Sequence, residues 1–357
     1  MPVSIYTIDQ SESWMNKISS LPDGIQDIYS TPKYYELNEL INEGKAYCFI
    51  YYNDNGYVIY PFLSNPISTL ELINFNNEFY DIQGAYGYNG ILTSSTSPLL
   101  IKEFHREFLT YCKDTNIIAE FTRFNPIINN STFSKYLDIS CVNRNIIVDL
   151  TLSKDYIWKN LFAHSVRKNV KKAHRHGLTV SRVPGNKMSK NWFNKFKRIY
   201  FDTLRRRNAD DFYYFNKEYF TFLNRKLGTS STYFFTLLGH DVIACELVIH
   251  YKYNSYSFLG GTLPQYFDMR PNDLLKVEII NSLKKFGFRY FCLGGGLKEN
   301  DGIYAYKKRF SVNGERKFYI GKRVHNVNVY EKLVKTWKKK YPDKEKIYNN
   351  VFLKYRK

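Results

Sequence analysis

Cysteine is scarce in this sequence and follows no ordered spacing. The five cysteines occur singly, with no CxxC pair among them: Cys48, Cys112, Cys141, Cys245 and Cys292. A disulfide framework and a zinc ribbon both need regularly spaced cysteines, so neither is expected. The seven histidines also form no metal-ligand pattern. We therefore expect a reduced, cytoplasmic protein with no bound metal and no bound cofactor.

Long apolar segments are missing too. No run of about 18 apolar residues occurs, so no segment is expected to span a membrane. The first residues, MPVSIYTIDQSESW, lack a basic start followed by an apolar stretch, and we expect no signal peptide. Peripheral attachment to the inner membrane surface stays open.

The motifs of several common enzyme classes are also absent. The sequence contains no GxSxG, HExxH or P-loop motif, which argues against the corresponding hydrolase, metalloprotease and NTPase sites. The glycines at 294–296 lack GxGxxG spacing, so a nicotinamide cofactor is not expected. Three glycines after a strand still predict that another group approaches this backbone closely.

Acidic residues are few relative to basic ones. Lys and Arg number 52 against 33 Asp and Glu, which gives a net charge of +19. Such a charge favours polyanionic partners, namely RNA, a nucleotide diphosphate or an anionic membrane surface. We expect no DNA partner. A compositional drift toward lysine is the alternative explanation.

The most basic segment is HSVRKNVKKAHRHG, residues 164–177. Its alanines and valines step by three and four residues, which predicts one packing face of a helix that ends at Gly177. The other face carries five cations and no acid: Arg167, Lys168, Lys171, Lys172 and Arg175. This stripe suits an RNA backbone or a donor diphosphate, and a solvated helix face is the alternative.

Apolar and aromatic residues are abundant, and their layout repeats. They make up 44% and 18% of the 357 residues, enough for packed cores in two domains. A helical period at 97–116 runs into a strand at 117–126, and the same order recurs at 271–287 and 288–296. A Gly- and Tyr-rich strand precedes each helix, as in YDIQGAYGYNG at 80–90. The repetition predicts two related α/β domains.

Three further features organise the chain. The boundary between the domains is expected near 143–158, where Ser153 caps a new helix, which gives domains at 1–150 and 151–319. Two apolar strands flank Gly239 in a hairpin at 232–253. The segment 329–357 is expected to be a basic helical tail. Two joined domains can form a cleft by themselves, so we expect a monomer.

Six motifs occur in an order that resembles a known family. They are Asp81 with AYGYNG, RFNP at 123–126, the VDL strand with the basic helix, RPNDLLKVE at 270–278, FCLGGG at 291–296 and YKKRF at 306–310. Over residues 30–330 they resemble the FemAB/FemX-like branch of the GNAT acyltransferase superfamily. The resemblance implies an α/β fold of two tandem GNAT-like domains with a central cleft, and a tail at 320–357 that returns to the first domain.

The resemblance also implies a reaction. Fem-type proteins move an amino acid from an aminoacyl-tRNA onto an amine of a peptidoglycan precursor, and relatives in the same branch are N-acyltransferases often linked to surface polysaccharide assembly. The expected function is therefore an acyltransferase that acts on a nucleotide- or lipid-linked cell-envelope precursor, with aminoacyl-tRNA as the donor. One alternative is an acyl-CoA-dependent N-acyltransferase acting on an amino sugar or lipid-linked sugar. Another is a non-catalytic protein that binds RNA or another polyanion.

Site residues carry over from the matching motifs. Lys307 takes the position of the family's F-K-x-x-F lysine, and Asp81 is expected to hold an amine or a hydroxyl, so both are candidate catalytic residues. Seven further residues are candidates for substrate binding: Tyr86, Tyr88, Arg123, Asn125, Tyr256, Gly295 and Tyr304. The GNAT loop that binds CoA pyrophosphate usually offers glycines, whereas MRPNDLL at 269–275 has none. This departure favours a donor other than acyl-CoA, since Pro271 also removes an amide donor.

Overall fold

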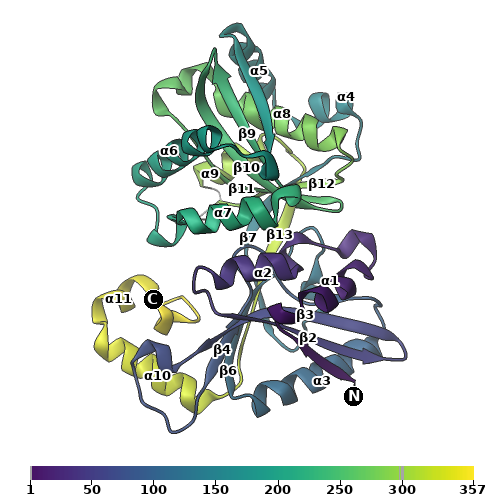
Figure 1. The fold of residues 1–357 in the computed structure, drawn as a ribbon, viewed down its shortest axis with the longest axis vertical. Helices are drawn as coiled ribbons and strands as arrows, with labels where there is room; N and C mark the ends of the chain where they lie inside the picture. Colours follow the sequence, from purple (N-terminus) through teal and green to yellow (C-terminus); the bar gives the residue numbers. More distant parts are fainter. Residues whose placement is uncertain (1, 297, 299–300) are drawn as a thin grey trace. The chain divides into compact units, whose positions relative to one another are not determined.

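The computed structural model describes residues 2–296, 298 and 301–357 (Figure 1). The chain divides into two compact units. Unit 1 comprises the chain up to Val142 together with Phe318–Lys357, and unit 2 comprises Asn143–Lys317. The chain changes unit within two strands, β7 (Asp138–Asp149) and β13 (Glu315–Val324).

Unit 1 is built on a mixed sheet with the strand order β1-β2-β3-β4-β6-β13, and β5 pairs with β3. Its strands pair antiparallel except for β4 and β6, which are parallel. Parallel neighbours need a long crossover, and here helix α3 provides it. The elements are β1 (Val3–Tyr6), β2 (Lys45–Asn53), β3 (Gly56–Pro66), β4 (Tyr80–Gln83), β5 (Leu92–Thr93), β6 (Ile117–Arg123), α1 (Ser11–Ser19), α2 (Pro32–Glu39), α3 (Pro98–Asp114), α10 (Val327–Lys340) and α11 (Pro342–Tyr348).

Two apolar clusters hold unit 1 together. Helix α3 buries Leu100, Phe104, Phe108 and Cys112 in a cluster with residues of β2 and β3, because these positions recur every four residues on one helix face. In the C-terminal tail, α10 buries Trp337 in a cluster that includes residues of β6. Figure 1 shows this tail in yellow beside β4 and β6. Burial of each large apolar side chain stabilises the folded state by about 1.5–3 kcal/mol.

Unit 2 repeats the plan of unit 1. Its strand order is β7-β12-β11-β10-β9-β8, and its one parallel pair among the described strands is β11 with β12, joined through helix α8. The remaining elements are β8 (Leu178–Pro184), β9 (Ser231–Leu238), β10 (Asp241–Tyr251), β11 (Asn254–Thr262), β12 (Tyr290–Gly294), α4 (Lys154–Tyr156), α5 (His164–Arg175), α6 (Lys190–Arg206), α7 (Lys217–Lys226), α8 (Pro271–Lys285) and α9 (Gly302–Lys308).

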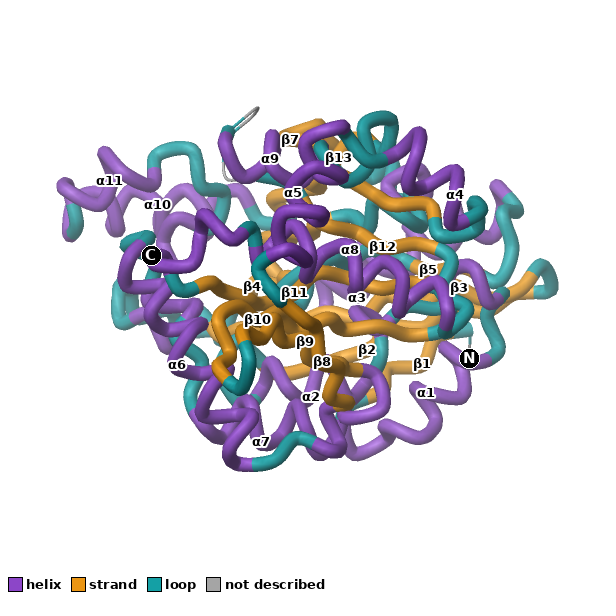
Figure 2. The backbone as a smooth tube through the Cα atoms, turned by 90° about the horizontal axis from the view of Figure 1, so that it is seen from above, coloured by secondary structure: helices purple, strands orange, loops and turns teal. Residues whose placement is uncertain are grey.

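The two faces of the unit 2 sheet are covered by different helices. On β10, Ala244 and Val248 belong to the cluster that contains α5 and α8, while the Cys245 thiol reaches the Phe196 carbonyl of α6. Figure 2 shows α5 beside α8. This division brings Glu246 of β10 to the α8 face of the sheet, where it meets a lysine of that helix.

The structure bears out the repeated strand–helix–strand layout. Helices α3 and α8 and strands β6 and β12 lie where the sequence periods predicted them. The hairpin also forms, with β9 and β10 antiparallel and Gly239 at φ +58°, a left-handed conformation that glycine adopts readily. The basic segment forms helix α5, and Gly177 follows its end at φ +71°.

Candidate active site

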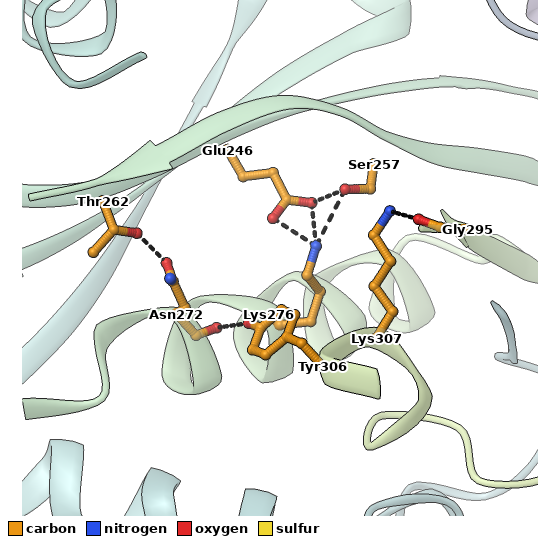
Figure 3. Close-up of polar contacts among 8 residues, drawn as sticks. All are labelled: Glu246, Ser257, Thr262, Asn272, Lys276, Gly295, Tyr306 and Lys307. Atoms are coloured by element: carbon orange, nitrogen blue, oxygen red, sulfur yellow. Dashed lines mark hydrogen bonds and ion pairs between the residues drawn. The ribbon is translucent and has the colours of Figure 1, made fainter. Parts of the chain in front are cut away.

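The most informative site in unit 2 is centred on Lys307 of α9. Its Nζ donates a hydrogen bond of 2.7 Å to the carbonyl oxygen of Gly295, just after β12 (Figure 3). Burial, the larger cause, and the nearby Lys276 ammonium together lower the Lys307 pKa to about 8. An ammonium with so low a pKa is poised to interact with an anion or to give up its proton near neutral pH.

A buried ion pair lies beside Lys307. The Nζ of Lys276 on α8 contacts both carboxylate oxygens of Glu246 on β10, with 2.6 Å to Oε2, and it donates to Ser257 Oγ at 3.2 Å. Ser257 of β11 in turn donates to Glu246 at 2.7 Å. Lys276 and Glu246 are only 5% and 8% exposed. The pair fixes one positive charge next to Lys307 (Figure 3).

Side chains of several other elements contact the first turn of α8. Asn272 accepts a hydrogen bond from the Thr262 hydroxyl through Oδ1, and its backbone carbonyl accepts from Tyr306 at 3.1 Å. Asp273 accepts from Asn169 at 3.1 Å and lies 3.8 Å from Arg309. This turn therefore contains a proline without an amide hydrogen and a carboxylate, and both disfavour an anion at the N-terminus of a helix.

The glycines after β12 are explained by the chain itself. A Cβ on Gly295 would lie 2.6 Å from the carbonyl oxygen of Arg144, and one on Gly296 would lie 2.1 Å from the Asp301 carboxylate. The close approach that the sequence predicts is therefore made by β7 and by the N-cap of α9. The Gly295 carbonyl remains part of the site as the acceptor for Lys307.

Tyr304 and Tyr256, both predicted to bind substrate, have buried side chains. Tyr304 is 3% exposed, and its hydroxyl donates to Glu315. Glu315 also pairs with Lys308 at 2.8 Å. Tyr256 of β11 is 1% exposed and lies in register with Cys292 of β12. The predicted substrate-binding roles of Tyr304 and Tyr256 thus fall on buried side chains.

Asp81, predicted as a catalytic residue, is engaged in a buried ion pair. It is fully buried in β4, and Arg356 Nε donates to both of its oxygens at 2.8 and 2.7 Å. The same guanidinium donates to the Asn65 carbonyl at 3.0 Å. Burial raises the Asp81 pKa, and Arg356 opposes that shift. Asp81 therefore anchors the C-terminal tail within unit 1.

The Tyr- and Gly-rich stretch and the RFNP motif lie side by side in unit 1. Asn89 bridges to Phe124, and its amide donates to the Arg123 carbonyl at 2.5 Å. The Tyr88 ring packs edge-on against Tyr29 and Phe318 at 5.4 and 5.7 Å. The Asn125 side chain caps its own loop by accepting from the Ile127 amide at 2.9 Å.

Tyr86, Tyr88 and Arg123 are half-buried, whereas Asp81 and Asn125 of the predicted unit 1 set are buried. The Tyr86 amide donates to Asn38 at 3.2 Å, and the Arg123 guanidinium lies 5.4 Å from the Phe121 ring. Gly87, at φ +111°, leaves room for the Tyr29 ring, which a Cβ would meet at 2.2 Å. The Tyr- and Gly-rich stretch therefore packs against other segments of unit 1, among them Tyr29 and Phe318.

The basic stripe on α5 divides into two groups. Arg167 turns back and donates to the carbonyls of Trp158, Lys159 and Phe162 at 3.1, 3.1 and 2.5 Å, so it caps the preceding turn instead of facing a phosphate. Lys168, Lys171 and Arg175 are exposed, and Lys172 is half-buried. These four cations remain available to an anionic partner.

Sequence reasoning missed four members of the site, Glu246, Ser257, Lys276 and Asn272. One signal was present: Glu246 and Lys276 are charged residues within apolar runs, VIACELVIH and DLLKVEII. Buried charges in such runs are rare unless they are paired. Nothing in the sequence indicated that these two pair with each other.

Two general properties complete the description. Within the described part of the chain, no three His, Cys, Asp or Glu residues gather as a metal site would require. Across residues 2–296, 298 and 301–357, no helix is both long enough and apolar enough to cross a bilayer.

Comparison with known proteins places this geometry in a family context. Residues 162–308 match the model of the acetyltransferase (GNAT) domain family. This match covers α5 to α9 and contains the whole Lys307 site. No curated protein matches the chain.

Solved structures share the fold over nearly the whole chain. FemX matches with a TM-score of 0.66 and 13% identity, over 93% of this chain and 99% of FemX. The C-terminal domain of a putative lysylphosphatidylglycerol synthetase from Agrobacterium fabrum matches at 0.54 and 11%, over 90% and 92%. L-PGS from Bacillus licheniformis matches at 0.53 and 12%, over 92% and 95%.

At these identities the likeness is one of fold. It confirms the expected α/β fold of two GNAT-like domains, and the family model over residues 162–308 supports an acyltransferase as the class of enzyme. The fold leaves open the donor, the acceptor and the roles of individual residues.

Proposed function

We propose that this protein transfers an aminoacyl group from an aminoacyl-tRNA to an amino group of a cell-envelope precursor. The observation that carries the proposal is the Lys307 ammonium, buried beside the Lys276–Glu246 pair and bonded to the Gly295 carbonyl inside the GNAT domain. Acyl transfer to an amine needs a positioned positive charge or donor for the developing oxyanion. Lys307 is the group we assign to that role.

The proposed reaction is a direct displacement. The neutral amine of the acceptor attacks the ester carbonyl of the donor, so that a C–N bond forms and the ester C–O bond breaks. The carbonyl oxygen becomes negative in the tetrahedral intermediate, and the Lys307 ammonium stabilises it. The proton lost from the amine ends on the departing ribose hydroxyl. The buried setting strengthens the interaction, because the local dielectric is low.

The donor preference rests on the first turn of α8. Pro271 has no amide hydrogen, and the Asp273 carboxylate adds negative charge to the same turn. These features weaken the anion site that a CoA pyrophosphate would use. The net charge of +19 favours a polyanionic donor. Both observations support aminoacyl-tRNA over acyl-CoA.

The acceptor is proposed as a nucleotide- or lipid-linked precursor of peptidoglycan or a surface polysaccharide. The half-buried Tyr86 and Arg123 of unit 1 are the candidates to bind it, with Tyr88 and Asn125 shaping their loops. Two other functions are outcomes of the same test: acylation of an amino sugar from acyl-CoA, and polyanion binding without catalysis.

The test uses the purified full chain with two donors, acetyl-CoA and a mixed aminoacyl-tRNA pool, each at low and high salt. We expect saturable tRNA binding that weakens steeply with salt, and loss of the aminoacyl group to an added amine acceptor. Turnover with acetyl-CoA and only weak, non-specific tRNA binding would overturn the donor assignment. Binding of tRNA with no transfer, in the presence of every acceptor tried, would overturn the enzymatic proposal.

A further inference from the structure

Unit 2 contains a hollow that lies apart from the Lys307 site. A cavity of about 410 Å³ opens between α5, α8 and the turn that follows α4. It runs along Val277–Lys284, the C-terminal half of α8, whereas the Lys307 site uses Asn272 and Lys276 in the N-terminal half. We call it the α5–α8 hollow. Its volume is within the range of small-molecule sites.

The floor of the hollow is apolar. Six of its lining residues are aliphatic or aromatic: Ile157, Trp158, Phe162, Val170, Val277 and Ile280. The turn that shapes it is a single π-turn, Ile157–Leu161, in which the Phe162 amide bonds to the Ile157 carbonyl at 3.1 Å. Such wide turns are frequent at functional sites. Arg167 holds this turn in place through the Trp158 and Phe162 carbonyls.

The rim of the hollow is basic. Lys154, Lys171, His174 and Lys284 lie around it, together with two acids: Asp155 lies 3.6 Å from Lys159, and Glu278 accepts from Asn281 at 3.3 Å. On α5 the rim continues into the exposed cations Lys168 and Arg175, which line a second, shallower hollow. The surface therefore joins an apolar pocket to a patch of positive charge.

Tyr156 and Lys159 are sequence neighbours of residues that line the hollow. Tyr156 is 48% exposed, unusually so for a large aromatic residue, and Lys159 is exposed next to the half-buried Trp158. Tyr, Trp and Lys are the residues that settle at the boundary between lipid headgroups and acyl chains, because each has an apolar body and a polar end. The phosphates, sugars and base edges of an RNA duplex are polar and would leave an apolar pocket unfilled.

From this juxtaposition we propose that the α5–α8 hollow is a docking site for the anionic lipids of a membrane surface. One acyl chain enters the apolar floor, and the phosphate of its headgroup meets Lys171 and His174. Lys168, Lys172 and Arg175 face the surrounding anionic headgroups. The proposal does not depend on the reaction at Lys307. Lipid binding at the hollow would hold the protein at the surface where lipid-linked compounds are found.

The first experiment measures binding of the full chain to vesicles by flotation. Vesicles contain phosphatidylcholine alone, or phosphatidylcholine mixed with phosphatidylglycerol. We expect binding only to the anionic vesicles, and a loss of about thirtyfold or more in the double variant Lys168→Glu/Lys171→Glu. The matched control is Lys190→Glu/Lys217→Glu, which makes the same charge change at exposed positions of α6 and α7. Equal binding by both double variants would overturn the proposal.

The second experiment tests entry of the acyl chain. Phosphatidylglycerol carrying bromine on its acyl chain quenches tryptophan emission on contact. We expect this quenching to disappear in Trp158→Phe and to persist in Trp192→Phe, which removes a tryptophan of α6 instead. Quenching that is unchanged by Trp158→Phe would overturn the proposal. So would a Lys168→Glu/Lys171→Glu variant that loses tRNA binding while it keeps vesicle binding, because the surface would then belong to RNA.

Discussion

Replacement of Lys307 by methionine should change how the stability of unit 2 depends on pH. Methionine has a similar length and no charge, so it removes the buried ammonium without leaving a large cavity. The Lys307 pKa is about 8 in the folded protein, against the ordinary lysine value of 10.5. Between these values the unfolded chain binds more protons than the folded chain, so Lys307 makes stability rise with pH.

The size of the effect follows from the shift. A difference of about 2.5 pKa units corresponds to about 3 kcal/mol in total, of which about 2 kcal/mol is gained between pH 7 and pH 9.5. The lost hydrogen bond to Gly295 also destabilises the variant, by a similar amount at both pH values. We therefore expect the wild type to gain about 2 kcal/mol relative to Lys307→Met over this range.

The assay is urea unfolding of both proteins at pH 7 and pH 9.5, followed by tryptophan emission. Taking the difference between the proteins removes the titration of all other groups. Lys308→Met is the matched control, because Lys308 is a half-exposed neighbour whose pairing with Glu315 contributes little. If the difference between wild type and Lys307→Met is the same at both pH values, Lys307 is not a desolvated ammonium and the argument for its role fails.

Three further predictions concern Lys307 and the two buried ion pairs. Lys307→Arg keeps a positive charge at all accessible pH values, so the fall in transfer rate that we expect above about pH 8 in the wild type should be absent from its rate–pH profile. Glu246→Gln leaves the Lys276 ammonium buried without its partner and should lower the free energy of unfolding by about 3–5 kcal/mol, measured by urea; a loss below about 1 kcal/mol would contradict the buried pair. Arg356→Ala strands the buried Asp81 carboxylate and should destabilise unit 1 by a similar amount in thermal unfolding, without the specific loss of transfer expected at Lys307.

The sequence predicted the repeated elements well because their signals are local. Helices α3 and α8 follow from apolar residues every three to four positions, and the β9–β10 hairpin follows from two apolar runs around Gly239. The Lys307 site could be recognised only through the order of short motifs. The periodicity of α9 by itself gives no reason to prefer Lys307 to its neighbour Lys308.

The contacts that the sequence could not predict join distant segments. Asp81 and Arg356 are separated by 275 residues, and Lys276 and Glu246 by 30, and no periodicity links them. Asp81 looked like a substrate ligand because it stands beside a flexible, aromatic loop. Its burial is caused by the C-terminal tail, which covers it with an arginine. The helical period likewise places Arg167 on the basic stripe. Its side chain instead turns back to cap a π-turn, which no sequence pattern predicts.

The central claim is that the Lys307 site performs acyl transfer from aminoacyl-tRNA. The most direct measurement is the single-turnover rate of transfer from a mixed aminoacyl-tRNA pool to a nucleotide-linked peptidoglycan precursor, for wild type, Lys307→Met and Lys308→Met. We expect transfer by the wild type and by Lys308→Met, and a loss of about 10²-fold or more in Lys307→Met with tRNA binding unchanged. Transfer by Lys307→Met at the wild-type rate would contradict the account.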